Sequence, residues 1–423
     1  MNFSRFNTYL STFNLFLIFI GYQLVTTIFL PNTLEVDPDN WLFLSRGVTL
    51  PYRGVAMFIS ITVILVNWRN QITLNNPMKL FFILWFFLIV RIVYDLKIRT
   101  DIFVDPVRAQ KTFIEVFLIC LIPVISVFKS IKSIDYNLAF KWIFAGFVFL
   151  IPLSFFRNPQ LFSNFALGVR LGGNIAFNTI EFGHYGGALV LLALYWKTQK
   201  WQFWLKCTSY LLMAVGVFIM LRAGSRGPLV TLLVCLLFYL VASKTYKIWA
   251  VGLVLISFVL LQMYGDLFFE SIRKISPVLV DRMTLSGNVN QFEELATGRS
   301  GLYQAAIDGF VNYPVFGQSF AIFRTDGSYS YSHNVILDTI MGLGLFGGIL
   351  FLIILFYALR NSYEMINNKH EYWWLAILCV HYIVMSMFSS CFYQSDSLNT
   401  VLVIILYQRL YISELHENSI SLR

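Results

Sequence analysis

The chain has 423 residues, of which 58% are hydrophobic, 17% aromatic and only 13% charged, and its formal net charge is +9. Soluble domains carry roughly 25% charged residues, so this composition leaves too little charge to cover a water-facing surface of this size. An ordinary soluble domain is excluded, and lipid is the expected solvent. The positive charge does not indicate a nucleic-acid partner, because no basic cluster interleaved with aromatic residues stands apart from the apolar runs.

Apolar runs of about 18 residues, enough to cross a hydrocarbon core of roughly 30 Å, recur along the chain. The first run follows Arg5 without a small-residue cleavage site after it, so we interpret it as a membrane span rather than a signal peptide. The pattern predicts an all-α polytopic membrane protein, with a single transmembrane domain over residues 1-423 and about 12 transmembrane helices. The predicted spans are 12-30, 51-67, 79-95, 112-128, 138-156, 179-196, 207-221, 228-243, 247-264, 334-358, 372-391 and 397-412.

The basic residues predict how the chain is oriented. If both termini are cytoplasmic, ten of the thirteen lysines lie in cytoplasmic loops, as the positive-inside rule requires. Twelve of the eighteen arginines lie on the opposite side. Because the planar guanidinium matches phosphate oxygens, these arginines predict an anionic ligand at the outer face. The alternative is that they contact lipid headgroups.

Two long outside loops interrupt the spans. Residues 265-332 form a loop far longer than the usual connection, and residues 157-178 form the second. In the first loop, the apolar spacing from Asp266 to Met283 predicts a helix lying at the interface. A second helix is expected to begin near Thr297 and to stop before Pro314.

The turn at residues 221-228 joins two spans with almost no loop, so Arg222 and Arg226 are expected at the outer membrane boundary. Gly224 and Gly227 permit a tight turn there. Two guanidiniums beside a helix N-terminus are typical of an anion site. The alternative is a tight turn with arginines that extend to the headgroups.

Arg299 at a predicted helix start and His333 before the tenth span are further candidates. Histidine has the unperturbed pKa nearest neutrality, which makes His333 a candidate general base. The alternative is that His333 is only a polar residue at a helix start. Ser332 is expected to cap the helix that follows.

Five polar residues in or beside the spans are given structural interpretations. Arg91 needs a partner inside the membrane, and Asp95, one turn later, is the expected one. Glu181 and His184 are three apart and share a face; we interpret them as a hydrogen-bonded helix end rather than an acid–base pair. His381 is interpreted as a hydrogen-bonded contact between helices.

The order of these motifs resembles the O-antigen ligase and O-antigen polymerase superfamily of bacterial envelope proteins. The resemblance covers residues 205-350, and its strength lies in the combination of several short motifs. The matching motifs are Gly224-Ser225-Arg226-Gly227, Arg299, Tyr313 to Gly317, His333-Asn334, and Gly342 to Gly347.

The resemblance implies a GT-C-like membrane fold and glycosyl transfer at the periplasmic face of the inner membrane. The implied donor is an undecaprenyl-pyrophosphate-linked oligosaccharide, the acceptor is a sugar hydroxyl, and no metal or other cofactor is required. Membrane lipid and a chain-length regulator are further partners that fit this function. The implied roles are general base for His333, pyrophosphate binding for Arg226, Arg299 and Arg222, with Arg226 ranked first, and contacts to the glycan or a second donor for Arg157, Arg170 and Asn334.

The resemblance leaves the acceptor open. A polymerase extends another lipid-linked repeat unit, whereas a ligase attaches the finished chain to the lipid A core. We favour the polymerase, because the arginines of residues 157-178 can hold a second lipid-linked glycan. A transporter or flippase is the alternative of another class; such proteins usually show broken helices and polar groups near the midplane, whereas the polar groups here gather at one face.

Overall fold

The structure is a computed structural model, and it describes residues 3–26, 28–29, 38–98, 116–157, 179–199, 203–243, 270–277, 279–280, 299–323 and 329–407. Regular structure in these ranges is helical apart from one antiparallel pair of two-residue strands. The elements are α1 (Phe3–Thr26), α2 (Pro38–Val66), α3 (Asn76–Lys97), η3 (Val116–Leu121), α5 (Ile122–Ser130), α6 (Tyr136–Arg157), α8 (Thr179–Thr198), α9 (Phe203–Ala223), α10 (Arg226–Ala242), α14 (Ser300–Asn312), β1 (Ile322–Phe323), β2 (Tyr329–Ser330), α15 (Val335–Asn367), α16 (Trp373–Ser389) and η4 (Phe392–Gln394). An apolar helix, Asp396–Tyr407, follows η4.

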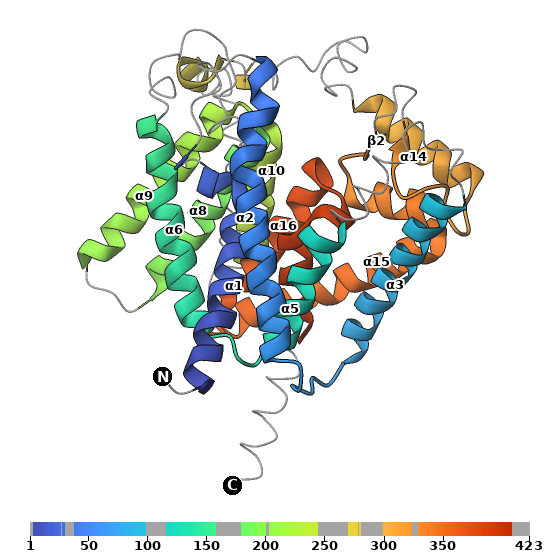
Figure 1. Ribbon diagram of the computed structural model, residues 1–423. Coiled ribbons are helices and arrows are strands. Elements are labelled where there is room, and N and C mark those ends of the chain that lie inside the picture. Colours follow the sequence, from blue (N-terminus) through green and yellow to red (C-terminus); the bar gives the residue numbers. More distant parts are fainter. Residues whose placement is uncertain are drawn as a thin grey trace.

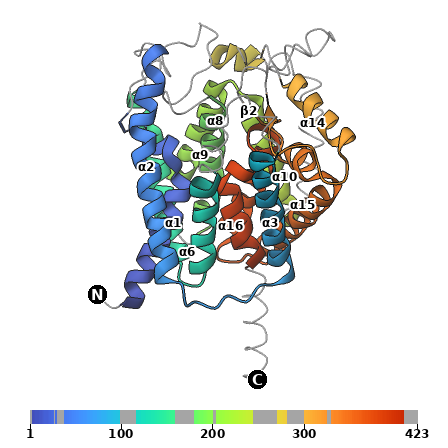
Figure 2. The same ribbon diagram turned by 45° about the vertical axis from the view of Figure 1, so that its right-hand side comes forward.

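The helices form one bundle. The helices α6, α8 and α9 lie on one side, and α3 and α15 lie on the other, with α1, α2 and α16 between them (Figure 1). The short elements α14 and β2 lie at the end of the bundle opposite the start of α1, and the view turned by 45° shows the same arrangement (Figure 2). We refer to this as the α14 end.

Length and composition agree with a membrane location. Six described helices are long and apolar enough to cross a membrane, and four shorter apolar helices accompany them. Eleven of the twelve predicted spans overlap described helices, while residues 247-264 lie outside the described ranges. The prediction of an all-α polytopic membrane protein is confirmed.

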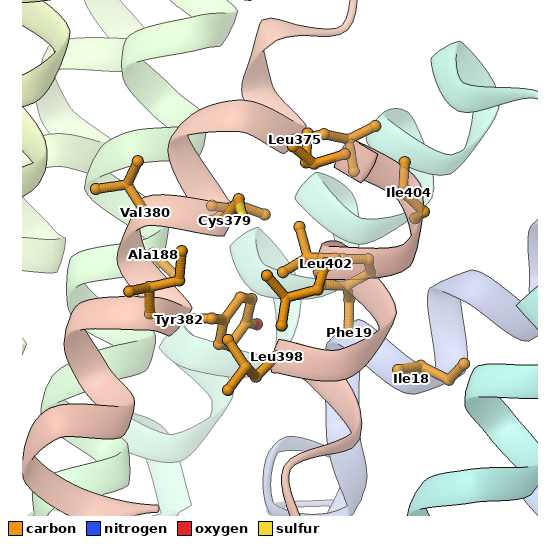
Figure 3. Close-up of a cluster of buried hydrophobic side chains, with 14 of the residues drawn as sticks. Ile18, Phe19, Ala188, Leu375, Cys379, Val380, Tyr382, Leu398, Leu402 and Ile404 are labelled. Atoms are coloured by element: carbon orange, nitrogen blue, oxygen red, sulfur yellow. The ribbon is translucent and has the colours of Figure 1, made fainter. Parts of the chain in front are cut away.

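The core forms where α1, α8, α16 and the helix Asp396–Tyr407 meet. Side chains of α16 and of the last helix point toward one another, as Figure 3 shows for Leu375 and Leu402. Phe19 of α1 completes the cluster, because its ring lies 6.3 Å from that of Trp374 and 5.9 Å from that of Tyr382. Lipid is as apolar as these side chains, so close packing rather than escape from water holds them together.

Small residues and buried amides join the helices. A Cβ atom on Gly186 of α8 would lie 2.7 Å from the carbonyl oxygen of Gly216 in α9, so only glycine allows this approach. Asn14 of α1 donates to Ser126 of α5 at 2.7 Å and accepts from Ser60 of α2 at 2.8 Å. Such hydrogen bonds fix the positions of helices that share no apolar driving force.

A loop inserts into α15, which is broken at Gly344. The Leu345 N–H would normally donate to the Met341 carbonyl, but it donates instead to the Pro314 carbonyl at 2.7 Å. The freed Met341 carbonyl accepts from the Gln318 N–H at 2.7 Å. We name residues 313–318 and 341–345 the loop–helix latch. Each half overlaps one of the motifs on which the family resemblance rests, Tyr313 to Gly317 and Gly342 to Gly347.

Two glycines make this insertion possible. Gly344 has φ +66°, and Gly317 has φ +76°. A Cβ atom on Gly344 would lie 2.3 Å from the Val315 carbonyl oxygen. The glycines therefore supply both the left-handed backbone and the space that the latch needs.

Helix α3 holds the loop in place. The Arg91 Nε donates to Asp95 Oδ2 at 3.0 Å, which confirms the ion pair predicted from the sequence. The same Asp95 oxygen accepts from the Phe320 N–H at 3.0 Å. A charged pair inside a membrane helix thus fixes the backbone just after the latch.

Candidate functional site

The predicted turn between two spans is present. Arg222 lies in the last turn of α9, and Arg226 is the first residue of α10. Gly224 has φ +59°, and its N–H donates to the Leu221 carbonyl at 3.1 Å. The turn is tight because glycine adopts this left-handed backbone without strain.

The two arginines of the turn have different surroundings. Arg222 is only 3% exposed, and its Nη1 donates to the Ile275 carbonyl at 3.2 Å. This bond ties the turn to residues 270–275, which are helical and lie within the predicted interfacial helix. Arg226 is half-buried in the first turn of α10, where the first N–H groups of a helix have no partner within that helix. Binding of an anion is therefore more favourable beside Arg226 than beside Arg222.

The third arginine approaches the same place from α14. Arg299 precedes α14, which ends before Pro314 as predicted, and its Nη1 donates to the Phe388 carbonyl in the last turn of α16. A Cβ atom on Gly227, the neighbour of Arg226, would lie 3.5 Å from Cβ of Phe388. The turn and the start of α14 therefore meet at the end of α16.

His333 follows β2 in an unusual backbone conformation. Its φ is +62°, a left-handed value that few residues other than glycine adopt. The ring of Tyr331 lies 4.4 Å from the His333 ring. Burial raises the pKa of Tyr331, which keeps its hydroxyl neutral and able to donate a hydrogen bond.

The cap of α15 differs from the prediction. The Asn334 Oδ1 accepts from the N–H groups of Ile336 and Leu337 at 3.0 and 3.1 Å, so Asn334, not Ser332, is the cap. Ser332 instead accepts from the Asn334 N–H at 3.2 Å and donates from its own N–H to Asp338 Oδ1 at 2.7 Å. These bonds fix the segment that carries His333.

A cavity of about 280 Å³ lies beside this segment, and we name it the polar cavity. Its walls come from α1, α2, η3, α8, the end of α16, the start of the last helix, and Tyr331. The side chains with ionisable groups that line it, apart from tyrosines, are Arg53, Glu181, His184, His381 and Asp396.

One structural interpretation made from the sequence was wrong, and the other is confirmed only as a contact between helices. His184 is 2% exposed and neither of its ring nitrogens has a hydrogen-bond partner within the described ranges, so it is not part of a hydrogen-bonded helix end. His381 is 1% exposed, and its Nδ1 likewise has no partner there. The two rings lie 5.6 Å apart and both line the polar cavity.

Comparison with known proteins supports the resemblance. Residues 208–352 match the family model described as O-antigen ligase. The match covers about a third of the chain and supports the O-antigen ligase and polymerase superfamily, as the motifs predicted. We call residues 208–352 the O-antigen ligase domain after this family model. No curated protein and no solved structure matches the chain.

The O-antigen ligase domain contains most of the predicted site, but not the polar cavity. Arg222, Arg226, Arg299 and His333 lie within the matched residues, whereas every ionisable side chain of the cavity other than Tyr331 lies outside them. Arg157 is the last residue of α6, and Arg170 lies outside the described residues. Only the three-residue spacing of Glu181 and His184 signalled the cavity, because its other walls are distant in the sequence.

Proposed function

We propose that the protein is a polymerase of O-antigen or a related surface polysaccharide, which joins undecaprenyl-pyrophosphate-linked repeat units at the periplasmic face of the inner membrane. The observation that carries the proposal is the meeting of two arginine-bearing elements at the end of α16. Ser389 and Ser390, which follow Phe388 there, line the polar cavity together with Tyr331, whose ring lies beside that of His333. The O-antigen ligase domain supplies the family context.

The proposed reaction is a direct displacement that requires no metal. A sugar hydroxyl of the acceptor attacks the anomeric carbon of the donor and forms the new C–O bond. The bond from that carbon to the pyrophosphate oxygen breaks, its electron pair leaves with the pyrophosphate, and the configuration inverts. His333 takes the proton of the attacking hydroxyl, and the arginines stabilise the charge that develops on the leaving group.

The arginines are assigned unequal roles. Arg226 at the start of α10 combines its guanidinium with the N–H groups of a helix N-terminus, and we assign it the pyrophosphate. Arg299 is assigned the same ligand from the α14 side, although its Nη1 also donates to the Phe388 carbonyl. Arg222 is assigned mainly to holding residues 270–275, because it is buried against the Ile275 carbonyl.

An O-antigen ligase is the second candidate, and the description of the matching family favours it. A ligase would use the same donor and the same displacement, with a sugar of the lipid A core as acceptor. The two candidates therefore differ only in the molecule that supplies the hydroxyl.

Reconstitution tests the proposal. The full chain is placed in vesicles with a lipid-pyrophosphate-linked repeat unit as sole substrate, and product length is followed by gel. We expect a ladder from the wild type that both His333→Ala and Arg226→Ala abolish. The matched controls are His370→Ala and Arg360→Ala. Both residues follow the break in α15 and lie away from the α14 end, so these variants should still form the ladder of products.

The other outcomes separate the candidates. A product that forms only when lipid A core is added would replace the polymerase with the ligase. Movement of the glycan across the bilayer without a new glycosidic bond would overturn the enzyme and support the transporter. A ladder that persists in His333→Ala would remove His333 from the reaction.

A further inference from the structure

The charged groups that line the polar cavity do not suit a phosphate ligand. It presents one guanidinium, from Arg53, and two carboxyl groups, from Glu181 and Asp396. Two acidic groups beside one cation repel a pyrophosphate, whereas sugar hydroxyls donate to carboxylates and accept from a guanidinium. The donor's charged group therefore belongs with Arg226 and Arg299, and an uncharged polyhydroxylated ligand suits the cavity.

Several polar groups of the cavity lack partners within the described ranges. They are Nδ1 and Nε2 of His184, Nδ1 of His381, and Nε of Arg53. These atoms are buried in the cavity wall, where a polar atom without a hydrogen bond costs roughly 1–3 kcal/mol, so the wall is polar and favours a polar occupant over an apolar one. Imidazoles and a guanidinium together offer donors and acceptors to hydroxyl groups.

The helical backbone of α1 is also interrupted at the cavity wall. Gly21 has φ +67° and breaks the helix where it lines the cavity wall. The Ile20 carbonyl accepts from the Tyr185 hydroxyl at 3.0 Å, so a tyrosine of the cavity wall covers the break. Irregular backbone within a membrane protein is tolerated where it is buried in protein or lines a cavity, which fits a ligand site.

Aromatic rings complete the cavity. Tyr22 lies under the Arg53 guanidinium, whose carbon is 4.5 Å from the ring centroid, and Tyr382 lines another wall. Tyrosine combines an apolar face, against which the C–H face of a sugar ring can pack, with a hydroxyl group. The volume of about 280 Å³ lies at the small end of ligand pockets, which run from roughly 300 to 1,000 Å³, and suits a single sugar ring.

Tyr331 connects the cavity to His333. It lines the cavity, and its ring lies 4.4 Å from that of His333. A ligand hydroxyl at the Tyr331 side of the cavity would therefore lie next to the proposed general base. The attacking hydroxyl belongs to the acceptor, so the acceptor rather than the donor is the occupant that this position favours.

We propose that the polar cavity binds the terminal sugar of the acceptor glycan, with Glu181, Asp396 and His184 hydrogen-bonded to its hydroxyl groups and the attacking hydroxyl directed past Tyr331 to His333. This inference rests on the proposed glycosyl transfer. The cavity residues bind and orient the acceptor, and the arginines near the end of α16 bind the donor.

The test measures acceptor and donor kinetics separately in the reconstituted full chain. The donor is the lipid-pyrophosphate-linked repeat unit, and the acceptor probe is the same repeat-unit glycan released from its lipid pyrophosphate by mild acid. Glu181→Gln, Asp396→Asn and His184→Gln should each raise the KM for the free glycan at least tenfold, with little change in the KM for the donor. The matched controls are Glu364→Gln and His370→Gln, which do not line the cavity and should leave both KM values unchanged.

A further variant tests the cavity without removing an ionisable group. Ser390→Phe adds bulk at the cavity wall without removing a charge, and it should also raise the KM for the free glycan. The KM values are compared only for variants that retain the melting temperature of the wild type in detergent.

The outcomes distinguish this inference from the proposed function. If the wild type forms no glycosidic bond with either acceptor, the proposed function itself fails. If the wild type transfers but correctly folded Glu181→Gln, Asp396→Asn and Ser390→Phe keep its acceptor KM, only the cavity assignment fails. A rise in donor KM alone would show that the cavity holds the donor sugar and would overturn the proposal.

Discussion

The loop–helix latch and the polar cavity are built in opposite ways. The latch joins two segments about 30 residues apart through backbone hydrogen bonds, and its special positions are the glycines Gly317 and Gly344. The cavity collects side chains from helices as distant as those of Arg53 and Asp396, several of which lack hydrogen-bond partners in the described ranges.

The latch should therefore stabilise the fold, whereas the cavity should cost stability. The latch satisfies the backbone groups that the break in α15 releases, so changes there should destabilise the protein. The cavity keeps polar groups buried without partners, so apolar replacements there should be tolerated or stabilising. Short motifs that mark a family can thus maintain the fold, while most of the polar cavity lies outside them.

The largest effect is expected from Gly344→Ala. Its Cβ atom would overlap the Val315 carbonyl, and alanine is strained at φ +66°, so the cost should be about 3 kcal/mol or more. The measurement is the fraction of folded protein and its melting temperature in detergent. Gly301→Ala in α14 is the control, because nothing lies within 4 Å of that Cβ position. Equal melting temperatures for the two variants would show that the latch is not required.

The next largest effect is expected at His333, which lies in the sequence between the two halves of the latch. Asparagine is among the few residues that tolerate a left-handed backbone, so His333→Asn should keep the fold while removing the proposed base. The expected loss of kcat is about 10²- to 10⁴-fold, and KM values and melting temperature should change little. Retention of kcat within twofold would assign His333 a structural role only.

The Arg91–Asp95 ion pair next to the latch should contribute more to stability than a surface ion pair with the same contact distance. Asp95→Asn leaves the charge of Arg91 uncompensated in a membrane helix and should cost about 3 kcal/mol. Glu364→Gln breaks the Arg360–Glu364 pair, which also has a 3.0 Å contact but is well exposed, and should cost less than about 1 kcal/mol. Similar losses of thermal stability in both variants would contradict the role of Asp95 in fixing Phe320.

A cavity variant should move stability in the opposite direction. His381→Leu removes a buried nitrogen without a described partner and replaces it with an apolar side chain of similar size. We expect no loss of stability and a gain of up to about 1 kcal/mol, read as a higher melting temperature. A clear decrease would indicate that His381 supports the fold, as the sequence had suggested.

The smallest effect separates capping from ligand contact at Asn334. Asn334→Ala removes the cap of α15 and should cost about 1 kcal/mol of stability. Asn334→Asp keeps a cap oxygen but loses the amide donor, so it should retain stability and glycan transfer. A stable Asn334→Asp protein with impaired transfer would instead support the predicted contact of Asn334 with the glycan.

The fold class and much of the local structure follow from the amino-acid sequence alone. Apolar runs in a lipid solvent define helices directly, which is why eleven predicted spans overlap described helices. Local spacing also identified the Arg91–Asp95 pair, the turn before Arg226 and the helix after Arg299. In each case the interacting groups lie within a few residues of one another.

The contacts between these elements, in contrast, depend on how the helices pack in three dimensions. The meeting of Arg299 with the end of α16, the insertion of the 313–318 loop into α15, and the cavity between Arg53 and Asp396 join residues about 30 to 340 positions apart. No periodicity encodes such contacts, because they depend on which helices pack together. His184 was misinterpreted for this reason: it looks like an ordinary polar residue of one helix, and the space that it shares with His381 exists only after α8 and α16 have packed.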